Sequence, residues 1–249
     1  MIGLIGSGNM ARAIARGLGE PVLCTDALGE RAQALADETG GEAVEGNGAL
    51  ADRADVVLLC HKPAQLDEVA EQVGGRAKGI VSILGGVPLA TVKAAYGGIP
   101  VVRVLPSTPV EVRSGVTVHA QDPDPPAELT SIALELFGRL GTVVTLPESQ
   151  LTTALGLMSS APAYMALVAE AQVDAGVRHG IPADVAARLV VATMKGTAEL
   201  LEHRGNDTLA VRREVTSPGG STARGLAALE RGGIRAAFHD AMDAVLEGR

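Results

Sequence analysis

Residues 1–11 read MIGLIGSGNMA, an apolar strand pattern that runs into the spacing G-x-G-x-x-A and then into a helical pattern. In such a motif Gly6 permits a tight turn, Gly8 lets the backbone approach a pyrophosphate, and the small Ala11 permits close packing of helix against strand. The motif follows a strand and precedes a helix, which is the context of a dinucleotide-binding βαβ unit. We therefore predict that this loop binds a dinucleotide cofactor through Gly6, Ser7, Gly8, Asn9 and Met10.

An acidic residue ends the second expected strand, at 22–26. Asp26 lies twenty residues after Gly6, a spacing at which a carboxylate bonds both hydroxyls of the adenosine ribose and repels a 2′-phosphate. The sequence therefore favours NADH over NADPH. Two alternatives stay open, because Asp26 could instead cap the helix that begins near Gly29, and the nearby Arg31 could accept a 2′-phosphate.

Apolar runs rich in β-branched residues recur between helical patterns in the first part of the chain. This alternation predicts parallel βαβ units whose strands are buried on both faces. The predicted fold class is α/β, with an N-terminal doubly wound, Rossmann-type, mostly parallel sheet. The further strands are expected at 56–59, 79–83, 101–105, 115–119 and 142–145, with helices at 64–73 and at about 126–137.

After Pro147 the strand signals stop and only helical patterns remain. We predict two domains, a dinucleotide-binding domain at 1–147 and an all-helical dimerisation and substrate domain at 148–249. Apolar residues cover much of the circumference of the helix expected at 182–204, which predicts burial against its neighbours and against a second subunit in a homodimer. The other helices are expected at 148–158, 161–179, 209–213, 219–231 and 234–247.

The composition excludes several classes of function. The formal net charge is −8 at pH 7, so we expect neither nucleic acid nor a membrane surface as a partner, since both attract clustered Lys and Arg. The two cysteines lie in expected buried strands, which indicates a reducing, cytoplasmic location. No targeting signal and no apolar stretch of membrane-spanning length is expected. The five histidines are scattered without metal-ligand spacing, so no metal site is predicted.

Ligands of doubly wound sheets collect at the carboxyl ends of the strands. Three loops at this edge carry candidate cofactor-binding residues, which are His61, Lys62 and Pro63, then Gly85 and Gly86, and finally Ser107 and Thr108. Each has a simpler interpretation. The histidine could be a polar loop residue, the lysine could be solvated, and the two hydroxyls could cap the following turn.

The segment 215–222, VTSPGGST, precedes the helical pattern ARGLAALE. Backbone N–H groups at a helix start lack intrahelical partners and lie at the positive end of the helix dipole, so the segment is suited to hold a small carboxylic acid. The alternative is an ordinary N-cap with a flexible lead-in.

With these residues identified, the chain resembles the pyrroline-5-carboxylate reductase family over essentially its whole length. The resemblance is carried by the segments 3–10, 61–63, 107–109, 161–164 and, above all, 215–230. It implies a homodimer with interlocked helical domains, in which the active site lies between the cofactor domain of one subunit and helices that include the partner's. In some members the dimers assemble into rings.

The resemblance implies hydride transfer from C4 of NADH or NADPH to the C=N carbon of pyrroline-5-carboxylate, which gives L-proline in the last step of proline biosynthesis. It assigns the substrate carboxylate to Ser217, Gly219, Gly220, Ser221 and Thr222. The hydroxyl of Thr222, the catalytic residue, is placed to bond the ring nitrogen. Asn47 matches a position near the adenosine ribose, and its alternative role is a helix cap.

The chain departs from the family at three positions. Members usually carry Asn at Ser107 and glycines at Ser159 and Ala161, so the substrate range stays open. Two other functions remain possible. One is a reductase of another cyclic imine or a small hydroxy acid, for which Lys195 is the only lysine in the helical region. The other is a non-catalytic nucleotide-binding homologue.

Overall fold

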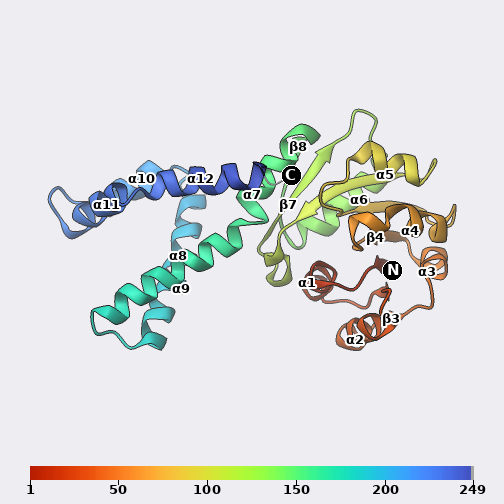
Figure 1. Ribbon diagram of the computed structural model, residues 1–249, viewed down its shortest axis with the longest axis horizontal. Helices are drawn as coiled ribbons and strands as arrows, with labels where there is room; N and C mark the ends of the chain where they lie inside the picture. The colour runs from red at the N-terminus through yellow and green to blue at the C-terminus, as the bar shows by residue number, and fades with distance from the viewer. Residues whose placement is uncertain (248–249) are drawn as a thin grey trace. The chain divides into compact units, whose positions relative to one another are not determined.

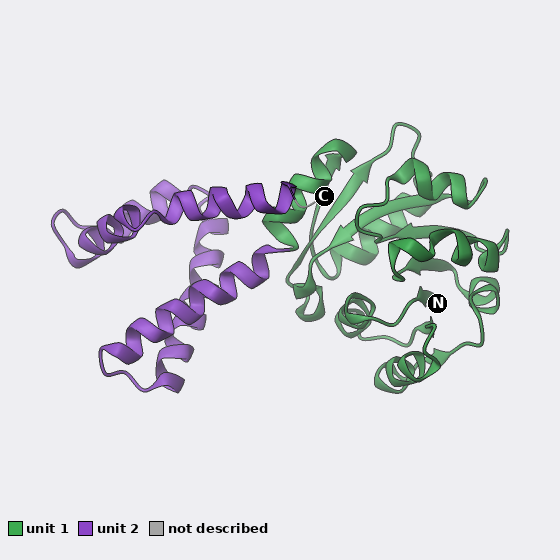
Figure 2. Cartoon of the chain, viewed as in Figure 1, with its two compact units in different colours: residues 1–159 green, residues 160–249 purple. Residues whose placement is uncertain are grey.

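The structure is a computed structural model that describes residues 1–247. The chain forms two compact units, residues 1–159 and 160–249 (Figure 2). The first unit contains every strand of the described chain, and the second is helical.

An eight-stranded sheet forms the centre of the first unit, in the order β3-β2-β1-β4-β5-β6-β7-β8. All neighbouring strands pair in parallel except β6 and β7, which are antiparallel. The predicted mostly parallel, doubly wound sheet is therefore confirmed. The strands are β1 (Ile2–Ile5), β2 (Leu23–Thr25), β3 (Glu42–Ala43), β4 (Val56–Leu59), β5 (Ile80–Ser82), β6 (Val101–Pro106), β7 (Gly115–Gln121) and β8 (Gly141–Pro147).

Helices cover both faces of this sheet (Figure 1). Leu4 and Ile5 are neighbours on β1, and because successive side chains of a strand point to opposite faces, they enter two different cores. Ile14 and Phe137 share the core of Leu4, whereas Leu50 and Val73 share that of Ile5. The helices of this unit are α1 (Asn9–Leu18), α2 (Gly29–Thr39), α3 (Asn47–Arg53), η1 (Pro63–Gln65), α4 (Leu66–Val73), α5 (Leu89–Ala95), η2 (Thr108–Val112), α6 (Ala127–Gly138), η3 (Glu148–Gln150) and α7 (Leu151–Met158).

The first unit ends later than the expected boundary at residue 147. Helix α7 buries Leu151 and Leu155 in a third core, against Leu105 of β6 and Val118 of β7. Helix α7 therefore packs against the sheet, although it follows β8, the last strand. Loss of strand signals marks the end of the sheet, whereas the compact unit ends where this apolar packing ends.

The second unit contains five helices among the described residues, at positions that follow the expected ranges closely. Within one chain, only Ala186 and Val211 of this unit are buried in the part that the structure describes. Large apolar side chains such as Leu167, Leu189 and Val191 are more than half exposed. The helices are α8 (Ala161–Arg178), α9 (Ala183–His203), α10 (Thr208–Glu214), α11 (Ser221–Arg231) and α12 (Ile234–Glu247).

The burial expected for 182–204 is not met within one chain, because α9 buries only Ala186. Ala186 packs close to Gly176 of α8. The other apolar side chains of α9 are half-buried or exposed within one chain.

One helical stretch, 148–178, is long and apolar enough to cross a membrane by length and composition. No such stretch was expected from the sequence. The helices α7 and α8 are separate elements within it, with Ser159 and Ser160 between them. Since α7 packs in the core of the first unit, its apolar character has an explanation in the fold.

Candidate active site

At Gly6 the glycine-rich loop has a conformation that other residues rarely adopt. Gly6 has a φ of +100°, and a Cβ atom there would lie 2.7 Å from the carbonyl carbon of Cys60. Helix α1 begins with Gly8 as its N-cap and has no side-chain cap. Its first-turn N–H groups therefore remain open to an anion, as a pyrophosphate site requires.

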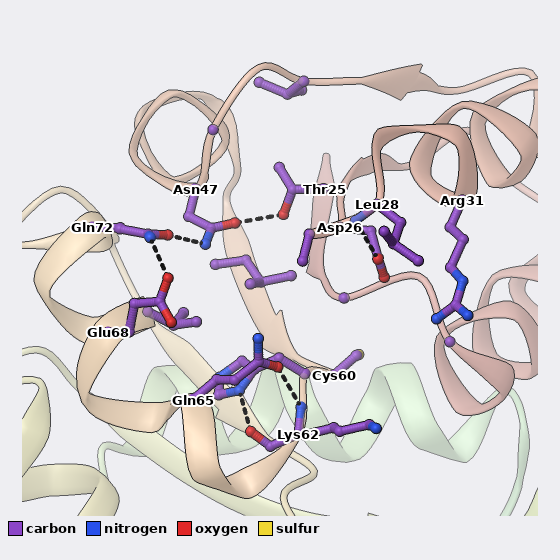
Figure 3. Close-up of a pocket in the computed structure, with 18 residues that line it drawn as sticks. Thr25, Asp26, Leu28, Arg31, Asn47, Cys60, Lys62, Gln65, Glu68 and Gln72 are labelled. Atoms are coloured by element: carbon purple, nitrogen blue, oxygen red, sulfur yellow. Dashed lines mark hydrogen bonds between the residues drawn. The ribbon is translucent and has the colours of Figure 1, made fainter.

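A cavity of about 460 Å³ lies next to this loop, at the carboxyl ends of β1, β2 and β4 (Figure 3). Six predicted residues line it, and these are Gly6, Gly8, Asp26, Asn47, His61 and Lys62. The other predicted cofactor residues are absent from its lining, namely Ser7, Asn9, Met10, Pro63, Gly85, Gly86, Ser107 and Thr108. Sequence reasoning missed several lining residues, among them Thr25, Gln65, Glu68, Val69 and Gln72.

The carboxylate of Asp26 bridges the glycine-rich loop and the start of α2. The N–H of Ser7 donates to its Oδ2 atom at 2.8 Å, and the N–H of Leu28 donates to its Oδ1 atom at 2.9 Å. The N-cap position of α2 is Leu28, without a side-chain cap. Asp26 therefore leads into α2 without being its capping residue. Arg31 also lines the cavity, so the alternative 2′-phosphate partner is present.

Asn47 joins three elements at the cavity wall. The hydroxyl of Thr25 donates to its Oδ1 atom at 2.6 Å, and its Nδ2 atom donates to Oε1 of Gln72 at 2.5 Å. The N-cap of α3 is Gly46, with no side-chain cap. The alternative role of Asn47 as a helix cap is therefore not realised, and its amide faces the side chains of β2 and α4.

The surroundings of His61 favour one tautomer of its neutral ring. Its Nδ1 lies 2.9 Å from the carbonyl oxygen of Lys62, to which an Nδ1–H donates. The Nε2 atom is shielded from solvent and has no hydrogen-bond partner among the described residues. Burial lowers the pKa of His61, and it raises the pKa of the adjacent Cys60 thiol to about 12. Neither group is suited to supply a proton near neutral pH.

The loops after β5 and β6 lie outside this cavity. Ser107 is buried, and its Oγ accepts a hydrogen bond from the N–H of Val116 at 2.9 Å. It ties β6 to β7, and its side chain does not cap the following turn η2. Gly85, Gly86 and Thr108 are exposed.

The predicted substrate segment begins α11 in the second unit. Gly219 has a φ of +68°, and the N–H of Gly220 donates to the carbonyl oxygen of Ser217 at 3.0 Å. Gly220 is the N-cap, so the helix has no side-chain cap. Ser221 and Thr222 are exposed. The capping interpretation is therefore not realised by a side chain, and the first N–H groups of α11 are available to a carboxylate.

The fold and the cavity define a Rossmann-type dinucleotide-binding protein with a helical second unit. The chain is 34% identical to the pyrroline-5-carboxylate reductase of Corynebacterium melassecola over 256 residues, which cover 98% of this chain and 95% of that protein. The chain therefore belongs to the pyrroline-5-carboxylate reductase family.

Family models match both parts of the chain. Residues 148–248 match the model of pyrroline-5-carboxylate reductase dimerisation. Residues 1–86 match the model described as NADP oxidoreductase, coenzyme F420-dependent.

Solved structures agree with this assignment. A pyrroline-5-carboxylate reductase from Coxiella burnetii has a TM-score of 0.87 and 29% identity, with 99% of this chain and 96% of that chain covered. The Plasmodium falciparum pyrroline carboxylate reductase, solved with NADP bound, has a TM-score of 0.87 at 24% identity and covers 99% of this chain and 95% of its own. It shares the fold.

Proposed function

We propose that this chain reduces the C=N bond of pyrroline-5-carboxylate to give L-proline, the last step of proline biosynthesis. The observation that carries the proposal is family membership over 98% of the chain. The open N–H groups at the start of α1 and the close approach at Gly6 fit a nicotinamide dinucleotide. When bound, the reduced nicotinamide supplies a hydride from C4 to the imine carbon.

The residues at the start of α11 bind the substrate. The carboxylate is held by the N–H groups that follow the turn at Ser217, Gly219 and Gly220, where the helix dipole favours an anion. Ser221 contributes to the same carboxylate-binding site. The hydroxyl of Thr222 bonds the ring nitrogen and orients the imine.

The reaction needs positioning more than a strong acid. A cyclic imine is largely protonated near neutral pH, and the iminium carbon is electrophilic without further help. Holding donor and acceptor in near-attack geometry can supply up to about 7–11 kcal/mol of the barrier. This account agrees with the surroundings of His61, whose Nε2 atom is shielded and whose pKa is lowered by burial.

NADH is the favoured cofactor. Asp26 already accepts the N–H of Ser7, so a 2′-phosphate at this place would meet a carboxylate. Two unit charges 4 Å apart repel by about 4 kcal/mol at an effective dielectric constant of about 20. Arg31 and Lys62 also line the cavity and would favour a phosphate. The preference for NADH therefore rests on the hydrogen bond that fixes the Asp26 carboxylate beside the glycine-rich loop.

The active form is a homodimer in the cytoplasm. Its helical unit leaves Leu167, Leu189 and Val191 more than half exposed in one chain, an apolar surface that a second subunit would bury. The match to a dimerisation model over 148–248 supports this assembly. The resemblance to the family extends this proposal to a ring of dimers. Two free cysteines and the net charge of −8 favour a reducing compartment without a nucleic-acid or membrane partner.

A direct assay tests the function. Purified protein is mixed with pyrroline-5-carboxylate and either NADH or NADPH, and the loss of nicotinamide absorbance is followed. Turnover supports the proposal. Cofactor binding without turnover favours a non-catalytic homologue or another substrate. A hydroxy-acid dehydrogenase would need a lysine from the helical unit. Nζ of Lys195 lies 3.9 Å from Oε1 of Glu199, one turn along the same helix, which favours an ordinary ion pair for this lysine.

A further inference from the structure

The cavity wall carries a chain of four side chains from three elements. Beyond the two hydrogen bonds of Asn47, the Nε2 atom of Gln72 donates to Oε1 of Glu68 at 3.2 Å. The chain thus runs from Thr25 on β2 through Asn47 on α3 to Gln72 and Glu68 on α4 (Figure 3). All four residues line the cofactor cavity.

We propose that Glu68 and Gln72 are positioning residues, which act through this chain of hydrogen bonds to orient the amide of Asn47 toward the adenosine ribose. The inference rests on the proposed function only in assigning the cavity to a nicotinamide dinucleotide. It assigns a role to two residues that sequence reasoning did not select.

The donor and acceptor order along this series of hydrogen bonds is set by the carboxylate of Glu68 at its end. An ionised carboxylate accepts hydrogen bonds only, so Glu68 requires the NH₂ group of Gln72 to face it. The carbonyl of Gln72 then faces Asn47 and requires the NH₂ group of that residue. Oδ1 of Asn47 is left to face Thr25, whose hydroxyl can donate. If Asn47 turned its amide over, Gln72 would have to turn too and would present an oxygen to the carboxylate.

This arrangement leaves Asn47 prepared for a ligand. An amide oxygen has two lone pairs and an amide nitrogen has two hydrogens. The hydrogen bonds to Thr25 and Gln72 use one lone pair of the Asn47 oxygen and one hydrogen of its nitrogen. One acceptor and one donor of Asn47 therefore remain for the two hydroxyls of a ribose.

A role in packing does not explain the two residues of α4. Glu68 and Gln72 are exposed and one helical turn apart. The apolar face of α4 is formed by Leu66, Val69 and Val73, which are buried in the core. Changes at Glu68 and Gln72 should therefore leave the fold intact.

The test uses Glu68→Gln, which keeps the size of the side chain but can donate as well as accept. We expect its dissociation constant for NADH to rise about three- to tenfold, because the orientation of Asn47 is no longer imposed. The value of kcat at saturating NADH should stay within about twofold. Gln72→Leu should have the same effect, and Glu68→Asp should recover part of the affinity. Glu71→Gln, an exposed neighbour on α4 outside the cavity lining, is the matched control and should bind NADH normally.

NADH analogues that lack the 2′- or 3′-hydroxyl of the adenosine ribose separate orientation from a general structural effect. In the parent protein, removing the hydroxyl that Asn47 binds should weaken binding, and in Glu68→Gln the same removal should have a smaller effect. Two results would overturn the proposal. One is that removing either hydroxyl weakens binding equally in Glu68→Gln and in the parent protein, and the other is that Glu68→Gln binds NADH as the parent protein does. Calorimetry measures NADH binding independently of turnover. If the parent protein binds NADH but does not reduce pyrroline-5-carboxylate, the proposed function fails, and the positioning role of Glu68 and Gln72 can still be tested. Failure of the parent protein to bind any dinucleotide would overturn both.

Discussion

Asp26 and Ser7 are joined by a hydrogen bond of 2.8 Å between the carboxylate of the one and the backbone N–H of the other. The bond links the end of β2 to the glycine-rich loop that precedes α1. A 2′-phosphate beside Asp26 would be repelled by this carboxylate, whereas ribose hydroxyls could donate to it. The choice between NADH and NADPH therefore depends on the side chain of Asp26.

Asp26→Ser should change the choice of cofactor. It removes the charge that opposes a 2′-phosphate and the acceptor for the ribose hydroxyls, so we expect kcat/KM to fall for NADH and to rise for NADPH. The ratio of the two values should shift by about tenfold or more, equivalent to at least about 1.4 kcal/mol. Steady-state kinetics with both cofactors measure it. Asp37→Ser, on the exposed side of α2, is the control, and an unchanged ratio in the Asp26 variant would refute the ribose assignment.

Thr222→Ala should slow turnover while leaving cofactor affinity nearly unchanged. The substitution removes one hydrogen bond to the substrate ring nitrogen, for which we expect kcat to fall about tenfold or more. Stopped-flow or steady-state rates give kcat, and calorimetry gives the dissociation constant for NADH. Thr208→Ala, at the exposed start of α10, should behave like the parent protein. A Thr222 variant with full activity would remove this hydroxyl from the mechanism.

An ion pair between a buried arginine and a half-buried glutamate should stabilise the first unit. Nη1 of Arg103 donates to Oε1 of Glu148 at 2.6 Å, and the same oxygen accepts the N–H of Leu89 at 2.6 Å. Arg103 on β6 is buried, so Glu148→Ala leaves its charge without this partner and should lower the free energy of unfolding by about 3 kcal/mol.

Urea denaturation measures this loss of stability. The double variant Arg103→Met, Glu148→Ala should lose less free energy of unfolding than the sum of the losses in the two single variants, because it leaves neither charge without its partner. Additive losses would contradict a direct role of the pair.

The stability of the protein should fall between pH 7 and pH 5, in part through His119. Burial lowers the pKa of this side chain below its ordinary value, and the charge of Asp122 opposes the shift in part. A group with a lowered pKa in the folded state contributes its full stability above the unfolded value of about 6.5 and loses it as the pH falls through the folded value. His119→Gln should therefore flatten the dependence of the melting temperature on pH in this range. The exposed His239→Gln is the control, and equal slopes in both variants would exclude His119 as a source.

Much of the fold could be predicted because it depends on local patterns. The strand 2–5 is apolar along its length since Leu4 and Ile5 enter cores on opposite faces, and such runs are typical of buried parallel strands. The surroundings of Ser107 could not be predicted in the same way. Its partner Val116 is brought near by the antiparallel pairing of β6 and β7, which no spacing in the sequence reveals.

The candidate site was predictable to a similar extent. Asp26 and His61 follow strands whose carboxyl ends meet, so topology alone brings them to one cavity. Glu68 and Gln72 carried a usable signal, since residues four apart share one face of the helix that follows His61. The sequence did not indicate that this face points to Asn47, because that depends on how α3 and α4 pack.

The destination of the transferred hydrogen tests the central claim most directly. NADH carrying deuterium at both positions of C4 is incubated with the protein and pyrroline-5-carboxylate, and the product is analysed by mass spectrometry and NMR. The account predicts L-proline with one deuterium at C5, formed in equal amount to the NADH consumed by the protein. Absence of labelled proline with deuterated NADH and NADPH alike, in a protein shown to bind the cofactor, would contradict it.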